Sequence, residues 1–88
     1  MKVLETKLFW KDVKKLPDNM TKKLVVLHEQ FKSADHLQDI ECIKLKNTDD
    51  LFRCKLGAYR LIFSYTDNDV TFLRVLSRKD VYDQLFKK

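Results

Sequence analysis

Residues 52–56 alternate between apolar and polar side chains, residues 59–63 do so except at Ile62, and only Gly57 and Ala58 separate the two stretches. This period of two, interrupted by a two-residue loop, predicts a β-hairpin that turns at Gly57-Ala58. One face of that hairpin carries the apolar residues Phe52, Cys54, Leu56, Tyr59, Leu61 and Phe63. The other face carries Arg53, Lys55 and Arg60. The apolar face predicts a core behind the sheet, and the basic face is either a solvated surface or an anion-binding surface.

The N-terminal part of the chain predicts one strand and two helices. Residues 2–6 are expected to form a short strand. Apolar residues at positions 9, 13 and 16 indicate an amphipathic helix that ends before Pro17, because a proline disfavours helical geometry in the residue before it. A second helix, capped by Asp18 or Asn19, has an apolar stripe made of Met20, Leu24, Leu27 and Phe31. Two such antiparallel helices need a sheet to cover their stripes.

The remaining segments are less regular in their pattern. Residues 36–50 are expected to be mostly irregular, with a turn at their end. Residues 70–77 predict a third antiparallel strand. A three-residue loop before this strand would put Leu73 and Val75 on the core face and Arg74 beside the other cations, whereas a two-residue loop would reverse these faces. Residues 78–88 repeat apolar side chains at helical spacing and predict a short C-terminal helix.

Together these elements predict an α+β fold in one domain spanning residues 1–88. Its expected order is an N-terminal strand, a helical hairpin, a three-stranded antiparallel meander and a short C-terminal helix. A chain of 88 residues, 44% of them apolar, is long enough for a single modest core.

Charge and cysteine content narrow the expected partners and location. The chain has 18 Lys and Arg against 13 Asp and Glu, a net charge of +5, which favours a nucleic acid or an acidic protein segment as partner. Cys42 and Cys54 lack a metal-binding spacing, and Cys54, on the apolar face of the hairpin, is expected to be a reduced core residue. No apolar run approaches the roughly 20 residues that span a bilayer, and the first residues lack the apolar segment of a signal peptide. We therefore expect a cytoplasmic protein with no membrane partner.

Three segments of the sequence carry a family resemblance. LKNTDDLFRCKLGAYRLIFSY and VLSRKDVY resemble the RelE/ParE toxin superfamily, and FWKDVKKLPDNMTKKL resembles the helical hairpin of that family. The similarity covers nearly the whole chain, and GAYR and SRKDVY are its most specific parts.

The resemblance implies the toxin of a type II toxin–antitoxin module, neutralised by a cognate antitoxin protein. RelE-like members enter the ribosomal A site and cut mRNA without a metal or another cofactor, using the 2′-hydroxyl of the RNA as the nucleophile. ParE-like members share the fold but poison DNA gyrase and cut no RNA. A degenerate, inactive nucleic-acid-binding relative is a third possibility. Trp10 is expected either in the core or in contact with the antitoxin.

Carried over by position, the RelE pattern implies a catalytic set made of Lys55, Arg60, Arg78 and Tyr82. Arg53 and Arg74 would bind RNA, with Arg53 and Arg60 clamping phosphate oxygens. Lys55 would act as general base, and Arg78 would stabilise the leaving 5′-oxygen or pass it a proton, unless it is only a surface charge at the helix N-terminus. Tyr82 would stack on a base or orient the nucleophile, unless it packs the helix against the sheet. His28 and His36 lie outside the matching segments and are expected to be surface or helix-face residues.

Overall fold

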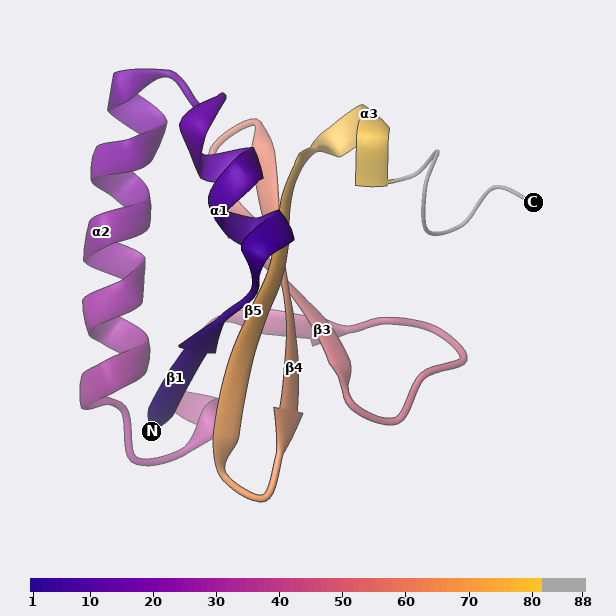
Figure 1. Cartoon of the computed structure of the whole chain (residues 1–88). Helices are drawn as coiled ribbons and strands as arrows, with labels where there is room; N and C mark the ends of the chain where they lie inside the picture. Colours follow the sequence, from indigo (N-terminus) through magenta and orange to yellow (C-terminus); the bar gives the residue numbers. More distant parts are fainter. Residues whose placement is uncertain (82–88) are drawn as a thin grey trace.

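The computed structural model describes residues 1–81. Within them the chain forms a five-stranded mixed sheet in the order β1-β5-β4-β3-β2, flanked by helices (Figure 1). The elements are β1 (Lys2–Glu5), α1 (Lys7–Lys14), α2 (Asp18–Ser33), the 3-10 helix η1 (Leu37–Asp39), β2 (Cys42–Lys44), β3 (Leu51–Leu56), β4 (Tyr59–Thr66), β5 (Asp69–Ser77) and α3 (Arg78–Val81). The predicted α+β class, the helical hairpin and the meander β3-β4-β5 are confirmed.

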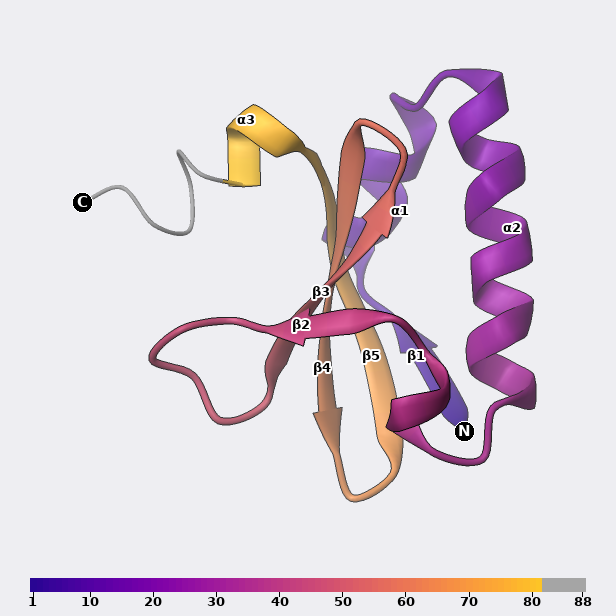
Figure 2. The ribbon, with the colours of Figure 1, turned by 180° about the vertical axis from the view of Figure 1, so that it is seen from behind.

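The two long helices cover one face of the sheet and enclose the main core. Figure 1 shows α1 and α2 together on one side of the strands and α3 on the other, and the reverse view in Figure 2 agrees. The rings of Phe31 from α2, Phe63 from β4 and Phe72 from β5 meet edge to face, with centroid distances of 4.9 and 5.2 Å from Phe31. Each of these three phenylalanines is fully buried, so aromatic packing helps to hold the helical hairpin on the sheet, together with the buried Leu16, Met20, Leu24 and Leu27.

The helix starts depart slightly from the sequence expectation. The Thr6 hydroxyl accepts the Phe9 N–H at 3.1 Å and begins α1 at Lys7. The expected cap of α2 by Asp18 or Asn19 is wrong, because Pro17 occupies the N-cap position and its carbonyl accepts the N–H of Met20 and of Thr21. Proline suits this place, since its fixed φ is compatible with the extended ψ of 152° found there and it has no N–H that needs a partner. Trp10 is 51% exposed, which contradicts the expected core position and leaves antitoxin contact as a prediction.

The β3–β4 hairpin has the predicted register. Leu56 pairs with Tyr59, Lys55 with Arg60 and Cys54 with Leu61. Gly57 has φ of 60° and Ala58 does not have positive φ, as in a type II′ turn, where glycine takes the first loop position. The predicted apolar face is the core face: Cys54, Leu56, Leu61 and Phe63 are buried, and Phe52 and Tyr59 pack against them.

The register of β4 and β5 combines the two alternatives that the sequence left open. Asp67 and Asn68 form a two-residue loop, and both have positive φ (52° and 68°), as in a type I′ turn. This loop puts Val70 and Phe72 in the core. A bulge then adds one residue to β5, because Phe63 pairs with Phe72 while Ile62 pairs with Arg74. The shift returns Val75 to the core face opposite Leu61.

The expectation of a mostly irregular segment at 36–50 is wrong in part. This segment contains η1 and the edge strand β2, which pairs antiparallel with β3. A strand of three residues is too short for its period of two to be recognised, and its partner lies beyond a loop. The strand therefore depends on long-range pairing rather than on local preference.

A second, smaller core lies on the face of the sheet away from α1 and α2. It consists of Leu45, Ile62, Leu76 and Val81, with Leu51 packed against it. α3 begins at Arg78, where the Ser77 hydroxyl accepts the Asp80 N–H at 3.1 Å. The part of the predicted C-terminal helix beyond Val81 lies outside the described residues. Among residues 1–81, no helix is both long enough and apolar enough to cross a bilayer.

Candidate functional site

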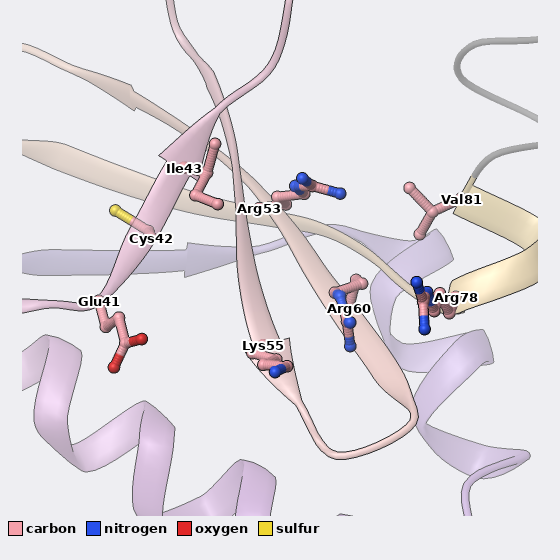
Figure 3. Close-up of a pocket in the computed structure, with 8 residues that line it drawn as sticks. All are labelled: Glu41, Cys42, Ile43, Arg53, Lys55, Arg60, Arg78 and Val81. Carbon is pink, nitrogen blue, oxygen red and sulfur yellow. The ribbon is translucent and has the colours of Figure 1, made fainter.

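A basic cleft opens between β2, the β3–β4 hairpin and the start of α3. It has a volume of about 310 Å³. Its lining residues are Glu41, Cys42, Ile43, Arg53, Lys55, Arg60, Arg78 and Val81 (Figure 3). We call this the basic cleft. Four of the six residues that the sequence analysis proposed for catalysis or RNA binding line it: Arg53, Lys55, Arg60 and Arg78.

The turn at Gly57-Ala58 explains why Lys55 and Arg60 lie side by side. A two-residue loop is closed by a hydrogen-bonded pair, here Leu56 and Tyr59, so the next pair along the ladder, Lys55 and Arg60, is not hydrogen-bonded. Side chains of such a pair approach each other more closely than those of a hydrogen-bonded pair. Arg53, two residues before Lys55, projects from the same face.

A backbone contact brings Arg78 to this group. The Arg78 N–H donates to the Ala58 carbonyl at 3.1 Å, so the end of β5 is attached to the tip of the hairpin. Figure 3 shows Arg53, Lys55 and Arg60 on the hairpin strands, with Arg78 across from Arg60 at the start of α3. Residues that are 18 or more positions apart in the sequence thereby share one cleft.

Arg60 is held in a defined orientation. Its Nη1 donates to the Gly57 carbonyl at 3.0 Å and to the Tyr59 carbonyl at 2.7 Å. Both contacts are made by Nη1. Within the described part of the chain, the Nε and Nη2 groups of Arg60 donate no side-chain hydrogen bond. A guanidinium carries five N–H donors, so a fork remains for an anion.

The cations of the basic cleft have no carboxylate partner within the described part of the chain. Ion pairs among residues 1–81 join His28 to Glu5 and Arg74 to Asp12, and none involves Arg53, Lys55, Arg60 or Arg78. Glu41 is the only carboxylate that lines the cleft among these residues. Four cations against one carboxylate make a positive field that attracts an anion, and phosphate is the group that guanidinium forks match best.

Two of the proposed residues are not placed in the basic cleft. Arg74 pairs with Asp12 on α1, and the two residues line a different hollow beside Leu16 and Tyr59. Hydrogen bonding to Asp12 raises the pKa of Arg74, so the guanidinium remains charged in this pair. Tyr82 lies outside the described residues.

Sequence reasoning missed four residues of the basic cleft: Glu41, Cys42, Ile43 and Val81. Glu41 and Ile43 were missed because β2 was not recognised, although Cys42 and Ile43 have strand-forming side chains. Ile43 on β2 is 59% exposed and Val81 on α3 is buried, so each of these two elements adds an apolar side chain to the lining of the cleft. No group of three or more His, Cys, Asp or Glu side chains suited to hold a metal ion occurs within residues 1–81.

The arrangement defines a class: a small α+β domain with a helical hairpin on one face of its sheet and a cationic cleft on the other. Residues 3–82 match the family model of the ParE toxin of type II toxin–antitoxin systems, parDE. Because the match covers nearly the whole chain, the protein belongs to this family.

The more specific likeness is to RelE. The chain is 33% identical over 85 residues to Toxin RelE3 of Methanocaldococcus jannaschii, which covers 94% of this chain and 97% of that protein. The RelB–RelE antitoxin–toxin complex from Methanococcus jannaschii matches with a TM-score of 0.81 and 27% identity, over 93% of this chain and 98% of that one. The archaeal RelE–RelB complex from Pyrococcus horikoshii matches with a TM-score of 0.72 and 26% identity, over 88% and 93%. The chain is a RelE-like toxin of a type II toxin–antitoxin system.

Proposed function

We propose that this toxin is an endoribonuclease that cuts mRNA on the ribosome, with the 2′-hydroxyl of the RNA as nucleophile. The observation that carries this proposal is the basic cleft, in which Arg53, Lys55, Arg60 and Arg78 converge without a carboxylate partner among residues 1–81. A protein surface that only binds another protein does not need this convergence of uncompensated charge around one concave site.

The geometry of the cleft supports a proposed role for each of its cations. Attack by the 2′-oxygen places additional negative charge on the scissile phosphate, and fixed cations lower the energy of that state. Arg60, already oriented by two backbone carbonyls, and Arg53 bind the non-bridging oxygens. The uncharged amine form of Lys55 accepts the proton of the 2′-hydroxyl and becomes the ammonium, and Arg78 stabilises the negative charge on the leaving 5′-oxygen. The chemistry requires no cofactor, since these side chains supply both charge and proton transfer. Tyr82 is proposed to stack on a base or to orient the nucleophile.

A cognate antitoxin is the proposed protein partner. The solved relatives from Methanococcus jannaschii and Pyrococcus horikoshii are complexes of a RelE toxin with a RelB antitoxin. A net charge of +5 favours an acidic antitoxin segment.

The second candidate function is inhibition of DNA gyrase without RNA cleavage. The match to the ParE family model favours this candidate, since ParE-like toxins act in that way. It assigns no role to the convergence of four cations, so it ranks below RNA cleavage.

One experiment separates the two. The toxin is expressed from an inducible promoter, and primer extension maps the 5′ ends of translated mRNAs before and after induction. RNA cleavage predicts new ends within translated codons, and these ends should disappear with Arg78→Ala but persist with Lys79→Ala, a matched exposed cation that does not line the cleft. Growth arrest with intact mRNA and accumulating gyrase–DNA breaks would support the gyrase poison instead. Neither arrest nor cleavage would indicate an inactive relative.

A further inference from the structure

Cys42 and Cys54 face each other directly across two neighbouring strands. Cys42 on the edge strand β2 pairs with Cys54 on β3. Both thiols are free; Cys54 is buried at 4% exposure and Cys42 is partly exposed. The pair lies on the core side of the sheet, where Cys42 packs against the main core that contains Cys54.

The hydrogen-bond pattern of the ladder identifies the type of this pair. The Leu45 N–H donates to the Leu51 carbonyl at 2.9 Å, which marks these two opposed residues as a hydrogen-bonded pair. Hydrogen-bonded and non-hydrogen-bonded pairs alternate along antiparallel strands, so Cys42 and Cys54, three steps away, form a non-hydrogen-bonded pair. Such pairs have Cα atoms about 4.5 Å apart, inside the range of about 4.4–6.8 Å that a disulfide spans.

The Cys54 thiol already points toward β2. Its Sγ donates to the carbonyl of Glu41, the residue before Cys42, at 3.3 Å. The two sulfur atoms can therefore meet by side-chain rotation, without a change in strand register.

We propose that Cys42 and Cys54 are a covalent modification site that takes up a reversible cross-strand disulfide by exchange with a small-molecule disulfide such as glutathione disulfide. The Cys42 thiolate, on the more exposed edge strand, attacks one sulfur of glutathione disulfide and releases one glutathione thiolate. The Cys54 thiolate then attacks the Cys42 sulfur of the mixed disulfide and releases the second. Both cysteine protons end on the two glutathione thiols, and the two electrons from the cysteine pair reduce the glutathione disulfide.

The bond would act on the wall of the basic cleft. Glu41 and Ile43, on either side of Cys42, both line that cleft. β2 has three residues and β3 as its only partner strand in the described sheet, so it is held by few contacts. A covalent link between β2 and β3 would restrict the separation of the two strands. It would thereby restrict the movement of the cleft wall that Glu41 and Ile43 form. The inference stands whether or not the chain cuts RNA.

The environment of the two cysteines should make disulfide formation slow and its rate dependent on pH. Burial raises the pKa of both thiols, for Cys54 to about 11, with smaller contributions from Cys42 and Glu41. The charged side chains in the hollow beside Cys54 are Asp39, Glu41 and Lys55, and α2 presents the uncharged Leu27, Gln30 and Ser33 there. Cys42 also lines the basic cleft, whose charged side chains are Glu41, Arg53, Lys55, Arg60 and Arg78. Because only the thiolate attacks, ring closure should accelerate about tenfold per pH unit below the pKa of Cys54.

The test exposes the folded, full-length protein to glutathione disulfide at pH 8 and pH 9, followed by alkylation and mass spectrometry. The expected product is a monomer lighter by two hydrogen atoms, unreactive to alkylation, with the Cys42 and Cys54 peptides linked and faster closure at pH 9. Cys54→Ser should stop at a glutathione adduct on Cys42, and Cys42→Ser should stay unmodified. Dithiothreitol should restore two free thiols.

Other outcomes would overturn the inference. A wild-type chain that remains reduced, stops at the mixed disulfide, or forms only disulfide-linked dimers has no intramolecular site. Amide hydrogen exchange of β2 in the oxidised and reduced wild-type protein tests the structural effect without a variant. Exchange at Ile43 and Lys44 should slow in the oxidised form, and equal rates would remove the proposed effect on the cleft wall.

Discussion

Arg74 on β5 and Asp12 on α1 form a two-point ion pair across 62 positions of sequence. The Arg74 Nε donates to Asp12 Oδ2 at 2.8 Å, and Nη2 donates to Oδ1 at 3.2 Å. The same Oδ2 accepts the Val75 N–H at 3.0 Å. Asp12 thus attaches α1 to β5 just past the bulge, and Arg74 takes part in the fold rather than in the basic cleft.

Asp12→Ala should destabilise the protein by about 1.5–3 kcal/mol, because it leaves both the guanidinium and the Val75 N–H without this acceptor. The measurement is urea unfolding followed by circular dichroism. Lys11→Ala, at the exposed neighbouring position, is the matched control and should change stability by no more than about 0.5 kcal/mol.

Arg74→Met should leave the RNA affinity of the folded protein unchanged. A loss of affinity equal to that of Arg53→Met would return Arg74 to the RNA-binding set.

Substitutions in the basic cleft should abolish cleavage without unfolding the chain. Arg60→Met and Arg78→Met should each lower the cleavage rate on programmed ribosomes by on the order of 100-fold or more, as expected when a transition-state cation is removed. Lys79→Met should retain the wild-type rate, since Lys79 is exposed and does not line the cleft. Single-turnover assays on purified ribosomes measure these rates. Equal losses for Lys79 and Arg78 would mean that only general surface charge matters.

Lys55→Arg separates charge from proton transfer. Arginine keeps the positive charge but does not act as a base in proteins, so RNA binding should persist while the cleavage rate falls by about 100-fold. The two quantities are measured by fluorescence anisotropy and by single-turnover cleavage. Full activity of this variant would exclude Lys55 as the general base.

RNA binding to the basic cleft should depend on salt. If its cations neutralise two to four phosphates of a single-stranded RNA, the plot of log affinity against log salt should have a slope of about −1.4 to −2.8. Arg53→Met should flatten that slope by about 0.7. Anisotropy titrations between low and physiological salt give both values, and an unchanged slope would place RNA elsewhere on the surface.

Gly57→Ala should destabilise the hairpin by about 1 kcal/mol, because Gly57 has φ of 60°, which alanine adopts only with strain. The added Cβ would also lie 2.9 Å from the Met20 side chain, whose flexible end can move. Ala58→Gly, at the next loop position, is the control and should cost only a few tenths of a kcal/mol. Thermal unfolding measures both, and a Gly57→Ala variant as stable as wild type would contradict this view of the turn.

Stability should fall in alkaline solution through Cys54. Burial raises its pKa from an ordinary 9.0 to about 11 in the folded chain, while the unfolded chain keeps the ordinary value. Below pH 9 both states hold the proton and the contribution of the buried thiol is intact. Between pH 9 and 11 the unfolded state loses its proton first, which removes up to about 2–3 kcal/mol. Cys54→Ala should lack this part of the decline, and an identical pH profile for the two proteins would refute it.

Local pattern was sufficient for the elements whose stabilising contacts are close in sequence. The period of two on either side of Gly57-Ala58 determined the hairpin, its register and its two faces, because a two-residue turn leaves one pairing that buries the apolar residues. The stripe from Met20 to Phe31 determined α2 in the same way. The basic face with Arg53, Lys55 and Arg60 was therefore visible in the sequence.

Tertiary structure alone decided the features that depend on distant partners. β2 forms because β3 supplies its hydrogen bonds. The bulge after Phe72 lies in β5, which contributes buried side chains to both cores of the protein. The contacts between Arg74 and Asp12, and likewise between Arg78 and Ala58, join residues far apart in sequence. Each of these contacts joins segments that no local period relates, so the assembled sheet, and no local pattern, places Arg78 in the cleft and Arg74 beside α1.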